Sequence, residues 1–490
     1  MRTEILRMSN VTFRKNGKTY LRNFELSVAA GQIMGLLLVD GYGAKELVDV
    51  LLFNKVLYNG CVYYCGERVN SWRQFPRKRN RITWIDERGF LIHEQNTLTN
   101  IFVLQAEKHY EILHDRLMEE AFRPYLEEAG LQIDPYQPVG KLSAYEQVSI
   151  ELLKGISSGS RLVILQNIDN ALSDRDLEKF GKLIRHYAEK GTSFLFLCSH
   201  LETLQGVCGQ IGIMKGGGIL SVLDEADALK QVCEVYSAEF SKSVRMYTQN
   251  RVLNEHAPEV FRQSGISCRE LKKFGFSVRK GECLCIQFLD NHVYETIEKA
   301  YLEGVATLSG EIDVEGKHWD RKDVQDVAIL SRNPDEKNLF PDLTFFDNVA
   351  MTMDYRYPAV WRDGRARRNL REELKRILGH DLWDKSIQSM SKRERYEVLY
   401  CRLLLQRPKV IIEFQPFHQA DVQDRFEIWK INEELLKEGI AVVLFSIGLS
   451  DSLAIADRLI RVESSGKWEE YRREDFGRLS RNIPWISMYR

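Results

Sequence analysis

The sequence repeats itself after about 250 residues, and this duplication limits the possible folds more than any other feature. In each half, an alternating strand-like segment and a glycine turn lead into an apolar strand that ends at an acidic residue. The same later landmarks then follow in the same order, which a coincidence would not preserve. We therefore infer a duplication. The paired segments are 21–41 with 271–291, 96–104 with 341–351, 139–155 with 387–405, 161–169 with 409–417, and 191–200 with 439–448.

The apolar strands of both halves are continuous rather than alternating. The runs 163–165, 194–197 and 441–445 contain only Val, Ile, Leu, Phe and Ala. Runs of this kind are typical of strands that are buried on both faces, as in a parallel sheet. The sequence therefore predicts a parallel sheet in each half.

Helical patterns lie between the strands, so each half is expected to be an α/β unit. A helical insert is expected around 97–155 in the first half and around 345–405 in the second. We expect two domains, residues 1–236 and residues 245–490. The segment that joins them carries a run of charged residues.

Charge and hydropathy exclude several classes of function. The 490 residues carry a net charge of -1 and a pI of about 6.8, without the basic excess of a nucleic-acid binder. No stretch approaches 18 uninterrupted apolar residues, so no transmembrane helix is expected, and the first residues lack the apolar core of a signal peptide. The nine cysteines form no C-x-x-C pair, which gives no zinc signal and suits a reducing cytosol.

The order and spacing of these segments resemble the fused, two-cassette ATPase subunit of bacterial sugar importers, the ribose, galactose and xylose type. The resemblance rests on runs such as GQIMGLLL, KLS, SHLETL, LFPDLTFFDNV and RPKVIIEFQP, and it covers nearly the whole chain. It implies two fused ATP-binding cassettes, each with a RecA-like parallel-sheet core and a helical subdomain. It also implies ATP and Mg²⁺ as cofactors and a membrane permease as the partner.

The phosphate-binding loop of this family reads G-x-x-x-x-G-K-S/T. Its backbone N–H groups and its lysine hold the phosphates, and its hydroxyl holds Mg²⁺. The first half keeps Gly41 and Gly43, but Leu38 replaces the first glycine and Ala44 replaces the lysine. Lys45, at the hydroxyl position, would reach the phosphates only after a one-residue slip. Its alternative role is that of a solvated helix residue.

The second half keeps none of this loop. Tyr294 stands at the lysine position, Glu295 at the hydroxyl position, and the β-branched Val293 resists the positive φ that such loops use. We expect Tyr294 and Phe288 to fill this site themselves. We expect Glu295 and Glu46 to fall in the first turn of a helix, where a carboxylate repels an incoming anion and stabilises the empty helix by about 0.3–1 kcal/mol.

The catalytic Asp-Glu pair of the family follows an apolar strand, where Asp orders Mg²⁺ and Glu polarises the attacking water. The first half has the amides Gln166 and Asn167 at these positions, and the second half has Phe414 and Gln415. An amide cannot take a proton or neutralise a metal. The glutamine that senses the γ-phosphate falls near Glu87.

Four further positions are candidates for nucleotide contact. Ser143 and Ser391 persist from the family's signature segment, although the glycines that follow are replaced. His200 stands at the switch-histidine position, and a capping or surface role is the alternative. Phe13 is a candidate for stacking on adenine, and packing in the core is the alternative.

The missing Walker A lysine and Walker B Asp-Glu pair predict a pseudo-ATPase with no metal site and with no cofactor or weak ATP–Mg²⁺ binding. Three hypotheses stay open. The chain is a non-catalytic scaffold or regulatory subunit of a carbohydrate-import type system, a divergent active ATPase that energises sugar import, or a soluble interaction protein unconnected with transport.

The partner expected under the first hypothesis is a permease-like or sensor subunit in the membrane. We expect it to dock in grooves near 85–105 and 330–350, which would hold the chain in the cytoplasm at the inner face of the membrane. No contact with nucleic acid is expected. We expect the large apolar residues of these segments to contact the partner, and packing of the helical insert against the core is the alternative. These residues are Leu91, Ile92, Phe340, Phe345 and Phe346.

Overall fold

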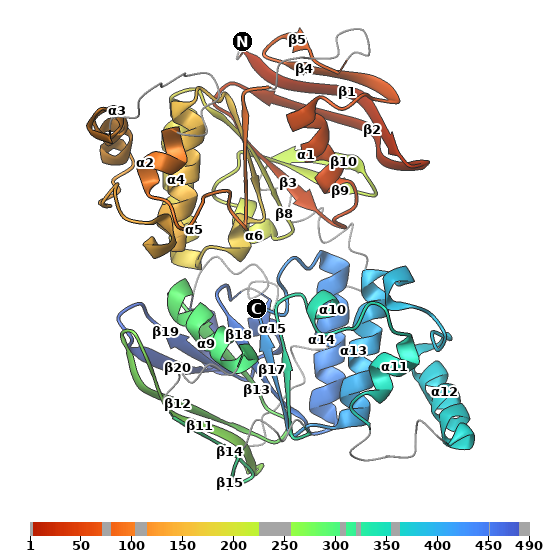
Figure 1. Cartoon of the computed structure of the whole chain (residues 1–490). Helices are drawn as coiled ribbons and strands as arrows, with labels where there is room; N and C mark the ends of the chain where they lie inside the picture. Colours follow the sequence, from red (N-terminus) through yellow and green to blue (C-terminus); the bar gives the residue numbers. More distant parts are fainter. Residues whose placement is uncertain are drawn as a thin grey trace. The chain divides into compact units, whose positions relative to one another are not determined.

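The chain divides into two units, Met1–Ser241 and Lys242–Arg490, in the computed structural model (Figure 1). The predicted junction between residues 236 and 245 lies outside the described residues. The structure describes residues 3–70, 80–102, 115–224, 256–303, 310–319, 325–353, 363–449 and 451–479.

The first unit has two sheets. A four-stranded antiparallel sheet has the order β2-β1-β4-β5, and a six-stranded sheet has the order β10-β9-β3-β8-β7-β6, parallel except for the β9–β10 pair. The strands are β1 (Glu4–Lys15), β2 (Lys18–Ala29), β3 (Ile33–Leu38), β4 (Asn59–Tyr64), β5 (Glu67–Arg68), β6 (Ile82–Asp86), β7 (Leu162–Gln166), β8 (Ser193–Cys198), β9 (Gln210–Lys215) and β10 (Gly218–Asp224).

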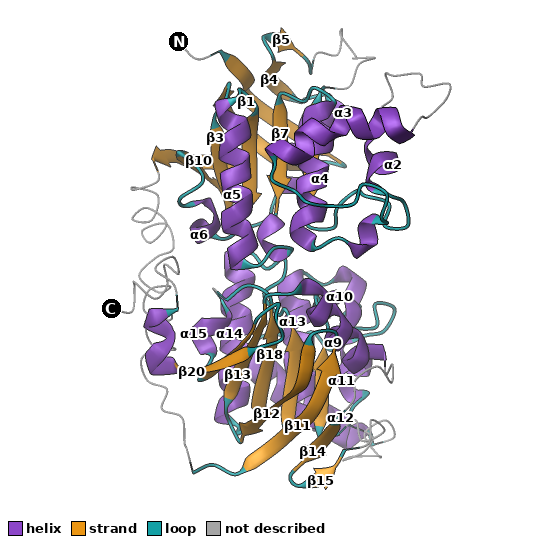
Figure 2. Cartoon of the chain, turned by 90° about the vertical axis from the view of Figure 1, so that its left-hand side faces the viewer, coloured by secondary structure: helices purple, strands orange, loops and turns teal. Residues whose placement is uncertain are grey.

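Helices cover both faces of the six-stranded sheet. The core on one face includes α1 and the antiparallel sheet, and the core on the other face includes α2 to α6 (Figure 2). The helices are α1 (Ala44–Phe53), α2 (Thr97–Phe102), α3 (Asp115–Glu128), α4 (Ala144–Ser157), α5 (Asp174–Glu189) and α6 (Leu201–Leu204), with 3₁₀ turns at Val139–Lys141 and Ile168–Asn170.

The second unit repeats this arrangement. Its antiparallel sheet has the order β12-β11-β14-β15, and its six-stranded sheet has the order β16-β17-β18-β13-β19-β20. The strands are β11 (Glu259–Cys268), β12 (Leu271–Arg279), β13 (Cys283–Phe288), β14 (Glu311–Val314), β15 (Lys317–His318), β16 (Val327–Leu330), β17 (Val410–Phe414), β18 (Ala441–Ser446), β19 (Arg458–Val462) and β20 (Trp468–Arg472). The helices are α9 (Asn291–Glu303), α10 (Pro334–Lys337), α11 (Phe345–Ala350), α12 (Gly364–Leu378), α13 (Lys392–Gln406), α14 (Val422–Lys437) and α15 (Ser452–Ile455), with 3₁₀ turns at Ile387–Ser389 and Arg473–Arg478.

The predicted parallel sheets are confirmed. Every residue of the central strands β3, β8, β13 and β18 is buried, because helices or a second sheet cover both faces. The carboxyl ends of the parallel strands share one edge of each sheet. That edge positions the loops that follow β3, β7 and β8 in the first unit, and β13, β17 and β18 in the second.

Candidate nucleotide sites

The loop between β3 and α1 is held by its own polar groups. The Asp40 carboxylate accepts the Gly216 N–H at 2.9 Å, and the Tyr42 hydroxyl donates to the Thr19 carbonyl at 2.9 Å. Gly43 has φ 82°, and a Cβ there would lie 2.4 Å from the Tyr20 carbonyl oxygen, so only glycine fits. The glycines therefore shape a tight turn against β2.

The N-terminus of α1 nevertheless stays open. No side chain caps it, and a Cβ built on Gly41 would meet no atom within 4 Å. Ala44 is buried at the lysine position, and Lys45 is exposed. Phe13 is only 8% exposed and belongs to the core, which favours the structural role that we weighed for it.

The corresponding helix start of the second unit is closed. The Asp290 carboxylate accepts the N–H groups of His292 at 2.8 Å and of Val293 at 3.3 Å. These are the donors that would otherwise bind an anion at a helix N-terminus. Asp290 therefore caps α9, and Glu295 lies beyond the first turn, contrary to the prediction.

Aromatic rings occupy the space beneath this helix start. Tyr294 and Phe288 have no measurable exposure, as expected, and their ring centroids lie 6.2 Å apart. Tyr294 also packs edge-on against Phe414 at 6.1 Å, and Phe414 stacks on Phe445 at 4.9 Å. The positions of the family's phosphate lysine and Mg²⁺ aspartate thus belong to one aromatic core.

The positions of the family's Asp-Glu pair, at the ends of β7 and β17, hold no carboxylate. The Gln166 side-chain oxygen accepts the Trp84 indole N–H at 3.1 Å. Asn167 and Gln415 both adopt a positive φ, 53° and 42°, directly after the strand. The two units therefore share the same backbone turn but have different side chains from the family.

A carboxylate does lie next to Phe414, on the neighbouring residue of the strand. Because successive side chains of a strand point to opposite faces, Glu413 faces α14, where it accepts an N–H of Asn432 at 3.2 Å. Burial raises the pKa of Glu413 to about 7, against the opposing effect of this hydrogen bond. Glu413 is therefore on the wrong face to serve a nucleotide beside α9.

His200 lies in a small acidic cluster at the carboxyl edge of the first sheet. Its Nδ1 lies 2.5 Å from an Asp169 carboxylate oxygen, and both side chains are nearly buried. The Asn170 amide donates to Glu87 at 2.7 Å. Burial raises the pKa of Glu87 to about 7, and the carboxylates of Asp169 and Asp86 add to this effect. The cluster can hold and exchange a proton near neutral pH.

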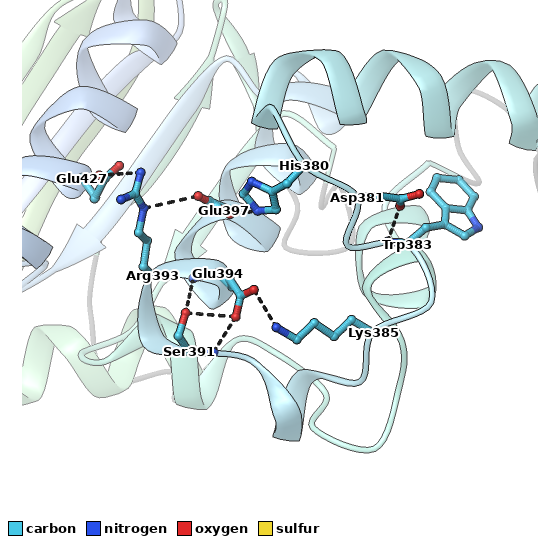
Figure 3. A network of polar contacts seen from close by, with 9 residues as sticks. All are labelled: His380, Asp381, Trp383, Lys385, Ser391, Arg393, Glu394, Glu397 and Glu427. Carbon is cyan, nitrogen blue, oxygen red and sulfur yellow. Dashed lines mark hydrogen bonds and ion pairs between the residues drawn. The ribbon is translucent and has the colours of Figure 1, made fainter.

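The two signature serines cap their own helices. Ser143 begins α4, and Ser391 begins α13, each with a reciprocal capping box. The Ser391 hydroxyl and backbone N–H both contact the Glu394 carboxylate, at 3.0 and 2.8 Å (Figure 3). Glu146 plays the same part for Ser143. A carboxylate therefore stands at both helix starts.

Ion pairs within the second unit surround the start of α13 (Figure 3). Arg393 contacts Glu397 at 3.5 Å and Glu427 at 3.1 Å, and Lys385 contacts Glu394 at 2.6 Å. Lys392 contacts Asp424 at 2.9 Å, so both basic residues that replace the family's glycines, Lys392 and Arg393, have acidic partners in their own unit.

The predicted docking segments are only partly exposed. Leu91, Phe345 and Phe346 are buried, with exposures of 8, 1 and 3%. Assigning these three to a partner surface was wrong, because they lie in the interior: Leu91 belongs to the core of the first unit, and Phe346 stacks on Trp383 at 4.5 Å. Ile92 and Phe340 are exposed, at 46 and 49%, and residues 103–105 lie outside the described residues.

Each docking segment is pinned by a buried asparagine. The Asn100 side chain accepts the Ile92 N–H at 2.7 Å and donates to its carbonyl at 3.1 Å. Asn348 makes the same pair of bonds to Phe340, at 2.8 and 3.0 Å. Both exposed apolar residues are therefore presented on fixed backbone.

Among the described residues, no helix combines the length and apolar character needed to cross a bilayer. The same residues include no group of three or more His, Cys, Asp or Glu side chains placed to hold a metal ion.

The fold and the order of these loops define two fused ATP-binding cassettes, each a parallel-sheet core with a helical subdomain. Over nearly its full length, the chain is homologous to the two-cassette ATP-binding proteins of ribose and xylose import. It is 22% identical to the xylose import ATP-binding protein of Shigella flexneri, covering 93% of this chain and 92% of the relative. It is 23% identical to the ribose import ATP-binding protein of Clostridium perfringens, covering 95% of each.

Two other comparisons complete this picture. The archaeal ribosome recycling factor aABCE1, solved in complex with the ribosomal stalk protein aP1, shares the fold with a TM-score of 0.60 and 15% identity. That match covers 97% of this chain and 92% of the factor. No family model matches the chain.

Three site features escaped the sequence analysis. Asp169 carried a signal, since it stands two residues after Asn167 at the carboxyl end of β7. Asn100 and Asn348 occupy equivalent places in the two repeats, so the duplication itself marked them. The cap by Asp290 had no distinct signal in the sequence. An aspartate at this position looks the same whether it belongs to a phosphate-binding loop or caps the helix that follows.

Proposed function

We propose that the chain is the ATP-binding-cassette subunit of a carbohydrate-import type system, acting without ATP hydrolysis as a scaffold or regulatory subunit on a membrane partner. Its cassettes would be residues 1–236 and 245–490. The relatives named for ribose and xylose import support the system. The closure of the second loop by Asp290 and the Tyr294–Phe414 contact carries the loss of catalysis.

The residues present do not fit ATP–Mg²⁺ in the second cassette. Phosphates would have to displace the Asp290 carboxylate from the α9 N–H groups, and Tyr294 supplies no positive charge. In the first cassette, Gly41, Gly43 and the open start of α1 leave room for an anion, but Ala44 supplies no cation and Gln166 no carboxylate for Mg²⁺. Any residual binding therefore belongs to the first cassette, through its glycine turn and Lys45.

Titration calorimetry with ATP–Mg²⁺ on the purified chain tests this proposal. We expect no heat attributable to the second cassette and at most millimolar affinity at the first. The Lys45→Ala variant should remove any weak signal, whereas Lys179→Ala, on the exposed face of α5, serves as the matched control. Micromolar affinity that survives in Lys45→Ala would overturn the proposal.

The divergent-ATPase hypothesis retains one supporting observation, the His200–Asp169 pair beside Glu87. These groups could hold and move a proton where the family's glutamate is missing. Phosphate release should be measured with the purified chain and with Asp169→Asn. Turnover that scales with the wild-type chain and disappears in Asp169→Asn would favour an active enzyme. Equal background rates in both would favour the pseudo-ATPase.

For the partner, we propose a permease-like or sensor subunit that contacts Ile92 and Phe340 at the segments near 85–105 and 330–350. Exposed apolar side chains on fixed backbone suit recognition, because little conformational entropy is lost on binding. This contact would place the chain in the cytoplasm at the inner face of the membrane. Association with such a partner, rather than nucleotide turnover, would then be its function.

A further inference from the structure

A cavity of about 430 Å³ opens in the second unit at the edge where the parallel strands begin. This edge lies opposite the one that carries the nucleotide-site loops. The wall is formed by α12, by the C-terminal ends of α13 and α14, and by the residues just before β17 and β18. The volume falls within the range of about 300–1,000 Å³ that is typical of small-molecule sites.

The cavity combines an aliphatic wall with a charged rim. Leu374 and Ile440 are buried, and Leu404 is half-buried beside them. The rim carries the exposed side chains of Lys280, Glu373, Arg407 and Glu438. Among the described residues, Lys280, Glu373 and Glu438 make no ion pair, in contrast to Lys409, whose ammonium contacts Glu315 at 3.0 Å.

The first unit joins the corresponding helices directly. Glu128, at the end of α3, contacts His186 at 2.7 Å and Lys190 at 2.5 Å, and these two residues lie at the end of α5. Lys190 and Glu438 hold equivalent places, each directly before the glycine that follows the helix. Glu438 therefore reverses the charge of Lys190, so Glu373 on α12 and Glu438 at the end of α14 are both carboxylates and cannot pair with each other.

We propose that this cavity binds a small zwitterion with an aliphatic body, of the amino-acid or short-peptide class. Its ammonium would pair with Glu373 and Glu438, its carboxylate with Lys280, and its aliphatic part would cover Leu374, Leu404 and Ile440. The C-terminal ends of α13 and α14 also favour a cation there. A pure anion would face two unpaired carboxylates, and a pure cation would leave Lys280 unpaired.

The bound zwitterion would join α12 to the end of α14 in the second unit, as Glu128 joins α3 to the end of α5 in the first. It would tie α12, which belongs to the helical insert, to the α/β core. This inference does not depend on the proposed loss of ATP hydrolysis, because the cavity lies at the other edge of the sheet.

Titration calorimetry with a matched series tests the site on the full chain. The probes are L-norleucine and leucyl-leucine, with hexylamine and hexanoate as analogues that lack one charged group. At least one zwitterion should bind, and both analogues should bind at least about tenfold more weakly. The proposal is refuted if neither zwitterion binds at about 10 mM. It is also refuted if hexylamine or hexanoate binds as tightly as the zwitterion.

The variants identify the cavity as the site. The double variant Glu373→Gln with Glu438→Gln should weaken the zwitterion at least about tenfold, whereas Glu372→Gln, on the same helix, should not. If the double variant melts at a lower temperature, Lys280→Gln replaces it and should weaken binding of the zwitterion but not of hexylamine. Unchanged zwitterion affinity in the folded variant places the binding elsewhere and overturns the assignment.

Discussion

Glu413 allows a quantitative test of the second cassette's core. Its side chain is 4% exposed, in a strand where the first repeat has the apolar Leu165. Two more positions show the same change from an apolar to a polar residue. Tyr396 replaces Val148 of the first repeat, and Asn432 replaces Ile184. Glu413→Gln removes the ionisable group and keeps an acceptor for the Asn432 amide.

The magnitude follows from the pKa. Burial raises the pKa of Glu413 from 4.5 to about 7, and one pKa unit corresponds to about 1.4 kcal/mol, so ionising this group costs the folded state about 3 kcal/mol. Because the folded state holds the proton more tightly, stability falls as pH rises. The cost is absent below pH 4.5, grows between pH 4.5 and 7, and is complete above pH 7. Relative to wild type, Glu413→Gln should therefore gain stability by about 3 kcal/mol between pH 4.5 and pH 8.

Hydrogen exchange of the β17 and β18 amides measures this difference for the second unit alone, which avoids a two-state treatment of the whole chain. Glu87 and Glu151 also have pKa values raised by burial to about 7, but both proteins contain them and their effects cancel. Glu434→Gln, which removes an exposed carboxylate of α14, is the matched control. A difference between Glu413→Gln and wild type that does not change with pH would refute the reasoning.

Three further outcomes are expected. Ser391→Ala should cost the second unit about 1 kcal/mol through its lost cap and leave ATP–Mg²⁺ titrations unchanged, as urea unfolding and calorimetry can check. Asn348→Ala should cost about 2–3 kcal/mol, since it removes the bonds that pin Phe340, and should raise hydrogen exchange at residues 338–340. The double variant Ile92→Asp with Phe340→Asp should abolish co-purification with the membrane partner and leave the melting temperature unchanged. In contrast, Phe345→Asp places a charge at a buried position and should unfold the insert. Retained co-purification of the double variant would exclude Ile92 and Phe340 as the docking surface.

The fold was predictable because the duplication and the continuous apolar strands each restrict it. Two copies of one pattern give independent support for every element, and strands such as 194–197 and 441–445 have few alternatives to a buried parallel sheet. The identity of the residues at the phosphate-loop positions could also be read directly. The spacing of the motifs alone shows Ala44 and Tyr294 at the lysine positions and Phe414 at the aspartate position.

The contacts within the sites could not be predicted in the same way. The sequence does not say whether Asp290 belongs to a loop or caps a helix, because this depends on where α9 begins. The exposure of the docking residues depends on the helical insert, which buries Phe345 and Phe346 and leaves Phe340 exposed. In the sequence, an apolar residue near the start of a helix looks the same whether its side chain is buried or exposed.

The two cassettes differ in how easily substitutions could restore nucleotide binding. In the first, the helix start is open and Lys45 is exposed beside it, so restoring the missing charges would replace one small buried residue, Ala44, and one half-buried amide, Gln166, rather than a large ring. In the second, a lysine at position 294 would place an ammonium among Phe288, Phe414 and Phe445, where the lost packing would unfold the unit before any phosphate could bind. Reversion is therefore open to one half of the chain and closed to the other, and an effort to engineer ATP dependence should begin with the first cassette.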